Sequence, residues 1–143
     1  METSMKRFLS ILCLTVILVS FLTAAAPLPN TTFTLVQGLP ATMNVGDTYT
    51  VIVQVESDQQ FISAQALPSF YYPGRGVVAV QGVDRVGSGT TATLEITYKA
   101  KTSTANFQDV APYGTAPVHF VVGVRYPGGY VAVQDYLFNV TVP

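Results

Sequence analysis

The fold of this chain is limited most by a strict alternation of apolar and polar residues in two long stretches. Residues 48–57 read TYTVIVQVES and residues 91–101 read TATLEITYKAK. The apolar positions that share one face are Tyr49, Val51, Val53 and Val55 in the first stretch and Ala92, Leu94, Ile96, Tyr98 and Ala100 in the second. A period of two places successive side chains on opposite faces of a β-strand. Both stretches are therefore predicted to be antiparallel strands with one buried and one solvated face.

Shorter apolar runs complete the pattern, and turn residues such as Gly, Pro and Asp separate them. The further predicted strands are residues 32–39, 60–67, 76–82, 117–126 and 130–142. No helical period occurs after Ala25. About seven short strands with turns between them are typical of an all-β, two-sheet antiparallel sandwich. A single small barrel is the alternative architecture.

Two features of the later part of the chain add detail to this prediction. Residues 102–116 form the longest irregular stretch, which is predicted to cross from one sheet to the other. In the last strand Val131 and Val133 are odd-numbered, whereas the apolar residues from Phe138 onward are even-numbered. If all of them face the core, one extra residue must be inserted, so we predict a β-bulge near Asp135 and Tyr136.

The N-terminal segment has the three parts of a secretory signal peptide. Lys6 and Arg7 precede an apolar run without charged residues over residues 8–22, and the small residues of TAAAP follow it. This order indicates cleavage after Ala25. An uncleaved membrane anchor is the alternative, because a spanning helix needs about 20 apolar residues and residues 8–26 approach that length. The prediction is a signal peptide, residues 1–25, and one domain, residues 26–143, that is secreted or held at the cell surface.

The predicted domain carries little charge and no cysteine. Removing Glu2, Lys6 and Arg7 from the chain totals of 8 acidic and 7 basic residues leaves 7 acidic and 5 basic ones, a net charge near −2. A nucleic-acid-binding protein needs a basic face that neutralises phosphates, so nucleic acid is not an expected partner. The single cysteine, Cys13, lies in the predicted signal peptide. The domain must therefore be stable without a disulfide.

Two segments make the chain similar to bacterial immunoglobulin-like and fibronectin-like domains of secreted and cell-surface proteins. NVGDTYTVIVQVES, residues 44–57, resembles the start of the second strand of such domains, and TATLEITYKAK is followed much later by a final FNVTV strand. Cohesin-like modules begin their second strand in a similar way, and that branch stays open. The resemblance implies an immunoglobulin-like β-sandwich.

One further segment resembles a feature of immunoglobulin domains. DVAPYG, residues 109–114, places Asp109, Ala111 and Tyr113 at the spacing of the tyrosine corner. Thr115 then stands where antibody domains have a cysteine, and the chain contains no tryptophan. These departures exclude an antibody-like domain. The alternative for Tyr113 is a loop tyrosine that packs locally.

Side chains for catalysis or metal binding are scarce. The only histidine, His119, alternates with the apolar residues Val118 and Phe120, so it is predicted to face the outside of its strand. One histidine and no cysteine after residue 25 do not make a zinc site. The aspartates are dispersed, without the closely spaced pairs that loop calcium sites use. We therefore predict no enzyme activity, no cofactor and no metal site.

Tyrosines beside two similar Pro-Gly turns are the remaining candidates for a contact surface. The stretches are YYPGRGVVAVQG, residues 71–82, and RYPGGYVAVQD, residues 125–135, and each Pro-Gly pair fits the middle of a type II turn. In immunoglobulin-like order these turns lie at opposite ends of the domain, so Tyr72 and Tyr126 should not share a site. The predicted contact surface consists of Tyr71, Tyr72, Arg75 and Tyr113. The alternative is that the aromatic rings only cap the ends of the core.

Two functions fit a sandwich of this kind. The first is a non-catalytic extracellular module that acts in adhesion, assembly or protein contact, with self-association through strand edges as one form of it. The second is a carbohydrate-binding module that uses loop tyrosines. The expected partner is thus an extracellular protein or a polysaccharide. A membrane is expected to be contacted only by the N-terminal segment, and only if that segment is not cleaved.

Overall fold

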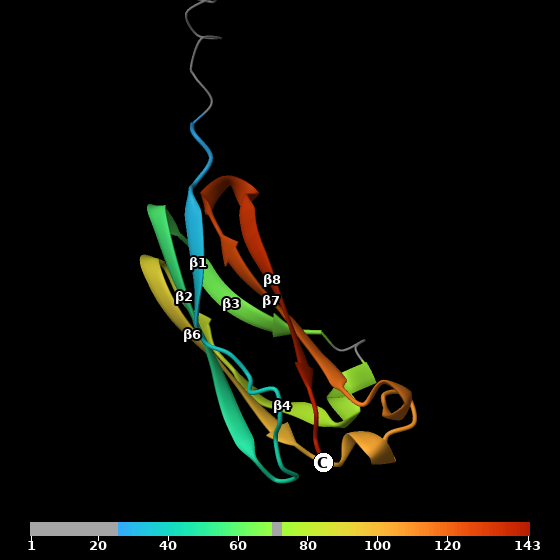
Figure 1. Cartoon of the computed structure of the whole chain (residues 1–143). Helices are drawn as coiled ribbons and strands as arrows, with labels where there is room; N and C mark the ends of the chain where they lie inside the picture. The colour runs from blue at the N-terminus through green and yellow to red at the C-terminus, as the bar shows by residue number, and fades with distance from the viewer. Residues whose placement is uncertain (1–25, 70–72) are drawn as a thin grey trace, which may run out of the picture.

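The computed structural model of the chain describes residues 26–69 and 73–143. Its strands form two four-stranded sheets packed face to face (Figure 1). The first sheet, in the order β1-β2-β6-β4, contains β1 (Thr31–Gln37), β2 (Thr48–Phe61), β6 (Gly89–Ala100) and β4 (Val78–Val83). The second sheet, in the order β5-β3-β7-β8, contains β5 (Arg85–Val86), β3 (Ser63–Pro68), β7 (Ala116–Arg125) and β8 (Val131–Val140). Neighbouring strands in both sheets are antiparallel.

The order of the strands identifies the fold. Lettered along the chain, β1 to β4 are strands A to D, and β6, β7 and β8 are strands E, F and G. The first sheet then holds A, B, E and D, and the second holds C, F and G, which is the arrangement of an immunoglobulin-like domain. The chain is therefore an all-β, immunoglobulin-like sandwich, as predicted, and its two separate sheets differ from the alternative barrel.

The predicted core faces of β6 and β7 are confirmed, whereas Tyr49, on the predicted core face of β2, is 37% exposed. All five alternating residues of β6, from Ala92 to Ala100, are buried, and so are Val118, Phe120, Val122 and Val124 of β7. Aromatic rings fill the space between the sheets, with the centroids of Phe120 and Tyr136 5.0 Å apart in a stacked arrangement. Burying a Val, Leu, Ile or Phe side chain contributes about 1.5–3 kcal/mol relative to leaving it exposed. Alternation in sequence thus becomes one continuous core between two sheets.

The connections between strands add short helical turns. Residues 102–116 cross from β6 in the first sheet to β7 in the second, as predicted, and contain η2 (Thr104–Asn106) and η3 (Ala111–Tyr113). Thr104 anchors this crossover, because its Oγ1 accepts from the Val142 N–H at 2.8 Å and its own N–H donates to the Val142 carbonyl. No helix in the two described ranges is long and apolar enough to span a bilayer.

Residues 26–69 and 73–143 form one strand more than the seven predicted. β5 is two residues long, follows β4 after Asp84 and pairs with β3 in the other sheet. The chain therefore changes sheets at Asp84, whose Oδ2 accepts from the Glu95 N–H at 3.2 Å. A two-residue strand is too short to show a period of two, which is why the alternation does not reveal it.

The predicted bulge in the last strand is wrong. The β7–β8 register runs without a shift from Ala116 opposite Val140 to Arg125 opposite Val131. Val131 and Val133 are exposed on the outer face of the sheet, and the even-numbered residues, Tyr136 and Phe138 among them, pack against the core. The error came from assigning two apolar valines to the core, although a strand can carry apolar side chains on its solvated face.

The two Pro-Gly turns differ in conformation. In η4 (Pro127–Gly129), Gly128 has φ 84° and ψ 0°, and the Gly129 N–H donates to the Tyr126 carbonyl, as predicted for a type II turn. In η1 (Pro73–Gly76) the prediction is wrong, because the four residues form a 3₁₀ turn and Gly74 has no positive φ. Gly74 is required for space instead, since an added Cβ would lie 1.8 Å from the Pro117 carbonyl oxygen.

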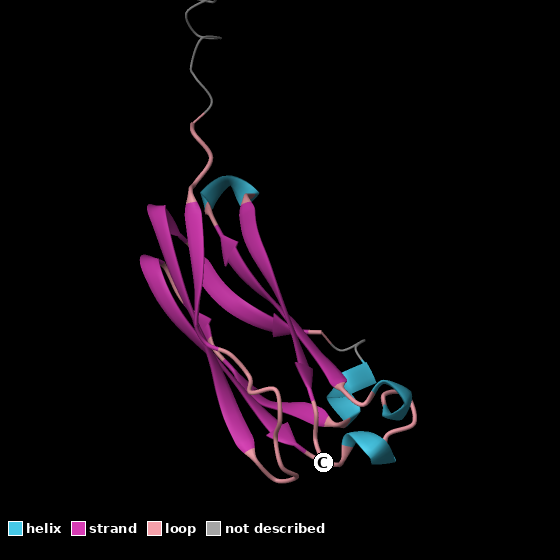
Figure 2. Ribbon diagram, in the orientation of Figure 1, coloured by secondary structure: helices cyan, strands magenta, loops and turns pink. Residues whose placement is uncertain are grey.

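The turns lie at opposite ends of the domain, as predicted. η1 packs against the start of β7 at Pro117, whereas η4 joins the end of β7 to β8. Figure 2 shows η4 as the helical turn at the upper end and η1 at the lower end, near η2 and η3. Tyr72 lies outside the described residues, so its distance from Tyr126 stays a prediction.

Candidate contact surface

Tyr126, which follows β7, belongs to the core and not to a contact surface. Tyr126 is buried, with only 1% of its surface exposed, and its ring packs edge-on against Phe61 and near Tyr130. Its hydroxyl donates to Ser57 Oγ at 2.7 Å and lies 2.6 Å from Thr31 Oγ1. This tyrosine therefore caps one end of the core, which is the alternative that the sequence left open for the aromatic rings.

Only part of the predicted contact surface can be placed. Tyr71 and Tyr72 lie outside the described residues. Arg75 is exposed on η1, and Tyr113 is 79% exposed on η3. Within the described ranges no hydrogen bond, ion pair or ring contact joins Tyr113 to another side chain, so it forms neither a tyrosine corner nor a local packing contact. Both residues lie at the η1 end of the domain.

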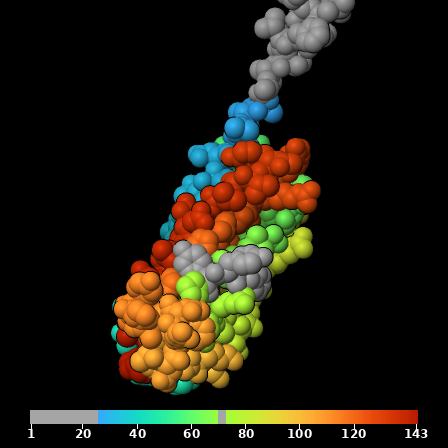
Figure 3. All heavy atoms as spheres, turned by 90° about the vertical axis from the view of Figure 1, so that its right-hand side faces the viewer, coloured from blue at the N-terminus to red at the C-terminus, as the bar shows by residue number. Residues whose placement is uncertain are grey.

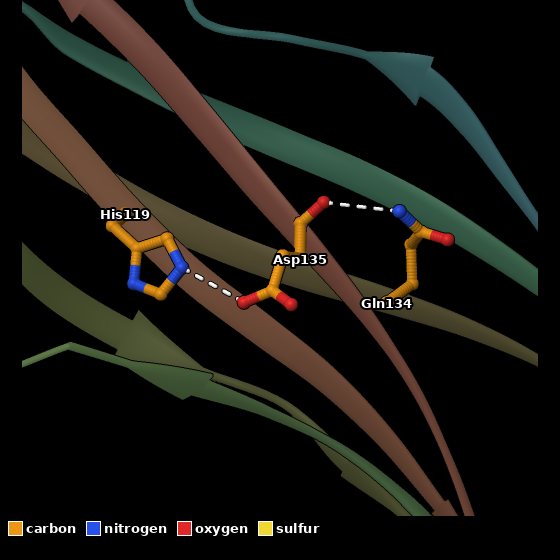
Figure 4. Close-up of polar contacts among 3 residues, drawn as sticks. All are labelled: His119, Gln134 and Asp135. Carbon is orange, nitrogen blue, oxygen red and sulfur yellow. Dashed lines mark hydrogen bonds and ion pairs between the residues drawn. The ribbon is translucent and has the colours of Figure 1, made fainter.

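His119 faces the outside of β7, as predicted, and pairs with Asp135 of β8. His119 Nε2 lies 2.9 Å from Asp135 Oδ1 (Figure 4). The histidine side chain is 20% exposed and the carboxylate 70% exposed. An exposed pair of this kind contributes about 0–1 kcal/mol. The pair therefore links two neighbouring strands on the outer face of the second sheet.

The dispersed aspartates stabilise turns and strand ends. Asp47 accepts from the Asn44 N–H at 2.8 Å, and Asp58 accepts from the Asn30 N–H at 2.9 Å. Each bond fixes the backbone where a strand begins or a loop passes. Across residues 26–69 and 73–143, no three His, Cys, Asp or Glu side chains lie close enough to hold a metal ion.

Core side chains border two hollows in the described part of the chain. A cavity of about 20 Å³ lies between the sheets near η1, and Tyr98, whose buried hydroxyl hydrogen-bonds to no described group, is among the residues that line it. Burial raises the pKa of this hydroxyl. A groove of about 390 Å³ lies beside β5, lined by Val55, Val86 and Ala92 together with threonines and Glu56. The cavity is far smaller than a small-molecule site, and the groove is lined mainly by polar side chains, unlike the largely apolar pockets that bind small molecules.

The edge of β8 is the longest open strand edge in the described part of the chain. The Tyr126 N–H donates to the Tyr130 carbonyl, and bonded and non-bonded pairs alternate along an antiparallel ladder. The even-numbered residues of β8 therefore bond to β7, and the odd-numbered residues point their N–H and C=O groups away from the sheet. The outward residues are Val131, Val133, Asp135, Leu137 and Asn139.

Thr141, the next odd-numbered residue, shows that this edge can hydrogen-bond to an added segment. The Thr141 N–H donates to the Ala41 carbonyl at 2.9 Å, and the Met43 N–H donates to the Thr141 carbonyl at 3.0 Å. Residues 41–43 of the same chain thus lie parallel to this end of the strand, through a bridge between Thr42 and Thr141, and satisfy both outward groups of Thr141. The end of the β8 edge therefore already accepts an added segment.

The remaining part of the edge is apolar and open. Val131, Val133 and Leu137 are 48%, 60% and 53% exposed on the outer face of the sheet. Figure 3 shows β8, in red, along the face of the molecule that is turned to the viewer. β8 carries no lysine, proline or bulge, which are among the features that protect an edge strand from pairing, and Asp135 is its one charged residue.

On each of two sheet edges, a glutamine side chain donates a hydrogen bond to one outward carbonyl. Gln134 Nε2 donates to the outward carbonyl of Asp135 at 3.1 Å (Figure 4). In β4, Gln81 Nε2 donates to the Val80 carbonyl at 3.2 Å, and Val80 also points away from its neighbour β6. The two VAVQ segments of the sequence thus form the edge strands of different sheets. Each supplies a glutamine that covers one free carbonyl.

Sequence reasoning missed the β8 edge as a site. Its signal was present in the odd-numbered positions of the last strand, where apolar residues surround one aspartate and no lysine or proline occurs. The prediction of a bulge turned these valines toward the core and so removed them from the candidate surface.

Comparisons with known proteins add only a general likeness of fold. No family model matches the chain, and no curated protein matches it. The native conformation of E. coli alpha-2-macroglobulin matches 83% of this chain with 18% identity and a TM-score of 0.43, and the match spans 7% of that chain. Murine CRIg matches 80% of this chain and 98% of its own, with 12% identity and a TM-score of 0.36. AvmM, which catalyses macrocyclization in alchivemycin A biosynthesis, matches 79% of this chain and 88% of its own, with 10% identity and a TM-score of 0.39.

Proposed function

We propose that this chain is a non-catalytic, extracellular or cell-surface module that acts in adhesion or assembly by binding a strand of another polypeptide at the edge of β8. The observation that carries the proposal is the row of outward N–H and C=O groups from Val131 to Asn139. Addition of an extended segment to an exposed sheet edge is a common mode of peptide recognition. The ladder supplies affinity, and the side chains beside it supply specificity.

The chemistry of the edge describes the segment that fits it. Val131, Val133 and Leu137 favour a partner strand with apolar or β-branched residues on the same face. Asp135 is the one charged residue of β8, so a basic residue on the partner is favoured and an acidic one is disfavoured. The partner is thus an extended, uncharged or basic segment.

A proline at position 133 tests the proposal. The Val133 N–H points away from β7, so Val133→Pro removes a donor from the open edge without removing a β7–β8 hydrogen bond. We expect a polypeptide that co-purifies with the unchanged exported protein to be lost from Val133→Pro and retained by Val133→Thr, which keeps the N–H and the branched shape. Equal recovery of the same polypeptide by both variants would contradict strand addition at β8.

Tyr113 favours a second candidate function, carbohydrate binding. Its ring is 79% exposed at the end of the domain that also carries Arg75, and an exposed tyrosine can stack on a sugar ring. We expect Tyr113→Ala to abolish any signal on a glycan array and Tyr130→Ala, at the other end, to leave it unchanged. A blank array with the unchanged protein removes this candidate.

Export is a separate part of the proposal. It is supported by the charged, apolar and small-residue parts of residues 1–25. We expect intact-mass analysis of the exported protein to show a chain that begins at Ala26. Recovery of the whole chain in the membrane fraction would instead support the anchor, and a cytoplasmic location would contradict export.

A further inference from the structure

We propose that the strand added at β8 is the β8 of a second copy of this chain, antiparallel and related by a two-fold axis at Val133. This inference rests on the proposed function, because it names the partner that occupies the same edge.

The first step compares the open edges in the described part of the chain. β8 has ten residues without a register shift. β1 has seven residues and a shift between Leu35 and Gln37, and β4 has six residues and a shift between Val80 and Gly82. Short and irregular edges resist strand addition. Two copies therefore meet through the same strand in each, which is an isologous contact with two-fold symmetry.

The second step fixes which residues oppose each other. Residues whose N–H and C=O groups point away from β7 must face such residues of the second copy, because these pairs exchange both N–H···O=C bonds. With the axis at Val133, this valine faces Val133 of the second copy, and Val131 faces Asp135 of the second copy. An axis at Gln134 would place Leu137 of the second copy opposite Val131 and take Asp135 out of the row that contains Arg125. An axis at Asp135 would place two carboxylates opposite each other, which is unfavourable.

The third step is charge complementarity between the copies. Arg125 lies beside Val131 in the β7–β8 register, so the chosen axis puts Arg125, Val131 and Asp135 of the second copy in one row. Arg125 and that aspartate are then two strand spacings, about 10 Å, apart along the row. An arginine can lay its methylene stem over an apolar neighbour and present its guanidinium beyond it. Symmetry provides this contact twice.

The fourth step concerns the carbonyl that Gln134 covers. Its side-chain amide donates to the Asp135 carbonyl at 3.1 Å, and this carbonyl would accept from Val131 of the second copy. The exposed glutamine can turn to water when the backbone donor replaces it, so pairing leaves no buried group without a hydrogen bond.

A charge swap tests the arrangement. By sedimentation equilibrium of the purified exported protein, we expect a concentration-dependent dimer. Arg125→Asp and Asp135→Arg should each raise the dissociation constant roughly tenfold or more. The double variant should restore most of the loss, because each charge again meets its opposite. Arg85→Asp, a matched change on β5, should leave the dissociation constant unchanged. Failure of the double variant to recover would overturn the proposed register.

Cysteine cross-linking locates the axis. We expect Val133→Cys to form a disulfide-linked dimer under mild oxidation, since Cα atoms of directly opposed residues in a bonded antiparallel pair are about 5.5 Å apart. Val36→Cys, at an exposed valine on β1, is the control and should form no disulfide-linked dimer. Cross-linking at Asp135→Cys instead of Val133→Cys would contradict the axis.

The outcomes separate this inference from the proposed function. A protein that stays monomeric at high concentration, but binds another polypeptide in a manner abolished by Val133→Pro, overturns the second copy and leaves strand addition standing. A dimer that persists in Val133→Pro overturns the β8 contact between copies. Absence of both the dimer and any Val133→Pro-sensitive partner overturns the inference and the proposed function together.

Discussion

Tyr98 and Tyr126 are both buried tyrosines, and their hydroxyl groups have different surroundings. Tyr126 bonds to Ser57 and Thr31, which joins the second sheet to the first. Tyr98 hydrogen-bonds to no group among the described residues. Its inward direction could be predicted from alternation, but the contacts of a hydroxyl depend on residues distant in sequence.

Replacement of Tyr126 by phenylalanine should destabilise the domain. Tyr126→Phe removes two hydrogen bonds and leaves two hydroxyls to find other partners, so we expect the free energy of unfolding to fall by about 1–3 kcal/mol. Urea denaturation measures this change. Tyr98→Phe is the matched variant and should cause no loss, because no described hydrogen bond is removed. A larger loss at Tyr98 than at Tyr126 would contradict this assignment.

Tyr98 also gives the stability an alkaline pH dependence. Burial raises the pKa of its hydroxyl above the ordinary value of 10.0, so the folded chain keeps the proton at a pH where the unfolded chain releases it. The contribution is complete below pH 10 and is lost as the pH rises toward the folded pKa. We expect the free energy of unfolding to fall above about pH 10. In Tyr98→Phe the decline should be shallower; an unchanged slope would contradict this origin.

Gly74 should tolerate no side chain. A Cβ there would lie 1.8 Å from the Pro117 carbonyl oxygen, so the backbone must shift. We expect Gly74→Ala to lower the free energy of unfolding by about 1–3 kcal/mol or more. Gly82→Ala, where an added Cβ meets nothing within 4 Å and φ is not positive, is the control. Equal thermal midpoints for the two variants would argue against this close approach.

At the scale of elements, β8 shows where alternation stops being informative. The pattern correctly identified the buried faces of β6 and β7, because threonines and charged residues mark the outer face of β6, and His119 and Arg125 mark that of β7. In β8 both faces carry apolar residues, and hydropathy alone could not tell which valines were exposed. The structure distinguishes them through the β7–β8 register.

Adjacent positions of β8 should respond differently to proline. The Gln134 N–H points to β7 and the Val133 N–H points away from it. We expect Gln134→Pro to lower the free energy of unfolding by about 1–3 kcal/mol more than Val133→Pro, because it also leaves a β7 carbonyl without its donor. Chemical denaturation of both variants measures the difference. Similar losses of free energy of unfolding in the two variants would show that the β7-bonded and outward positions of β8 have been assigned incorrectly.

At the scale of the whole molecule, the sequence predicted the class of fold but not the open edge of β8. Alternating strands and the crossover of residues 102–116 were sufficient to predict two sheets. An open edge is a property of strand order, since a strand is exposed only if no other strand pairs with its second side. Val131 pairs with Arg125 on one side and with nothing described on the other, which no local pattern encodes.

The parallel contact at Thr141 has a consequence for the size of any assembly. Ala41 and Met43 already hydrogen-bond to one end of the edge. An added strand can therefore pair only along a fixed length, between this segment and the β7–β8 hairpin. When a second copy pairs with residues 131–135 of this edge, its own residues 131–135 are covered at the same time. Growth by this route therefore terminates at two chains, and the geometry works against open-ended fibres.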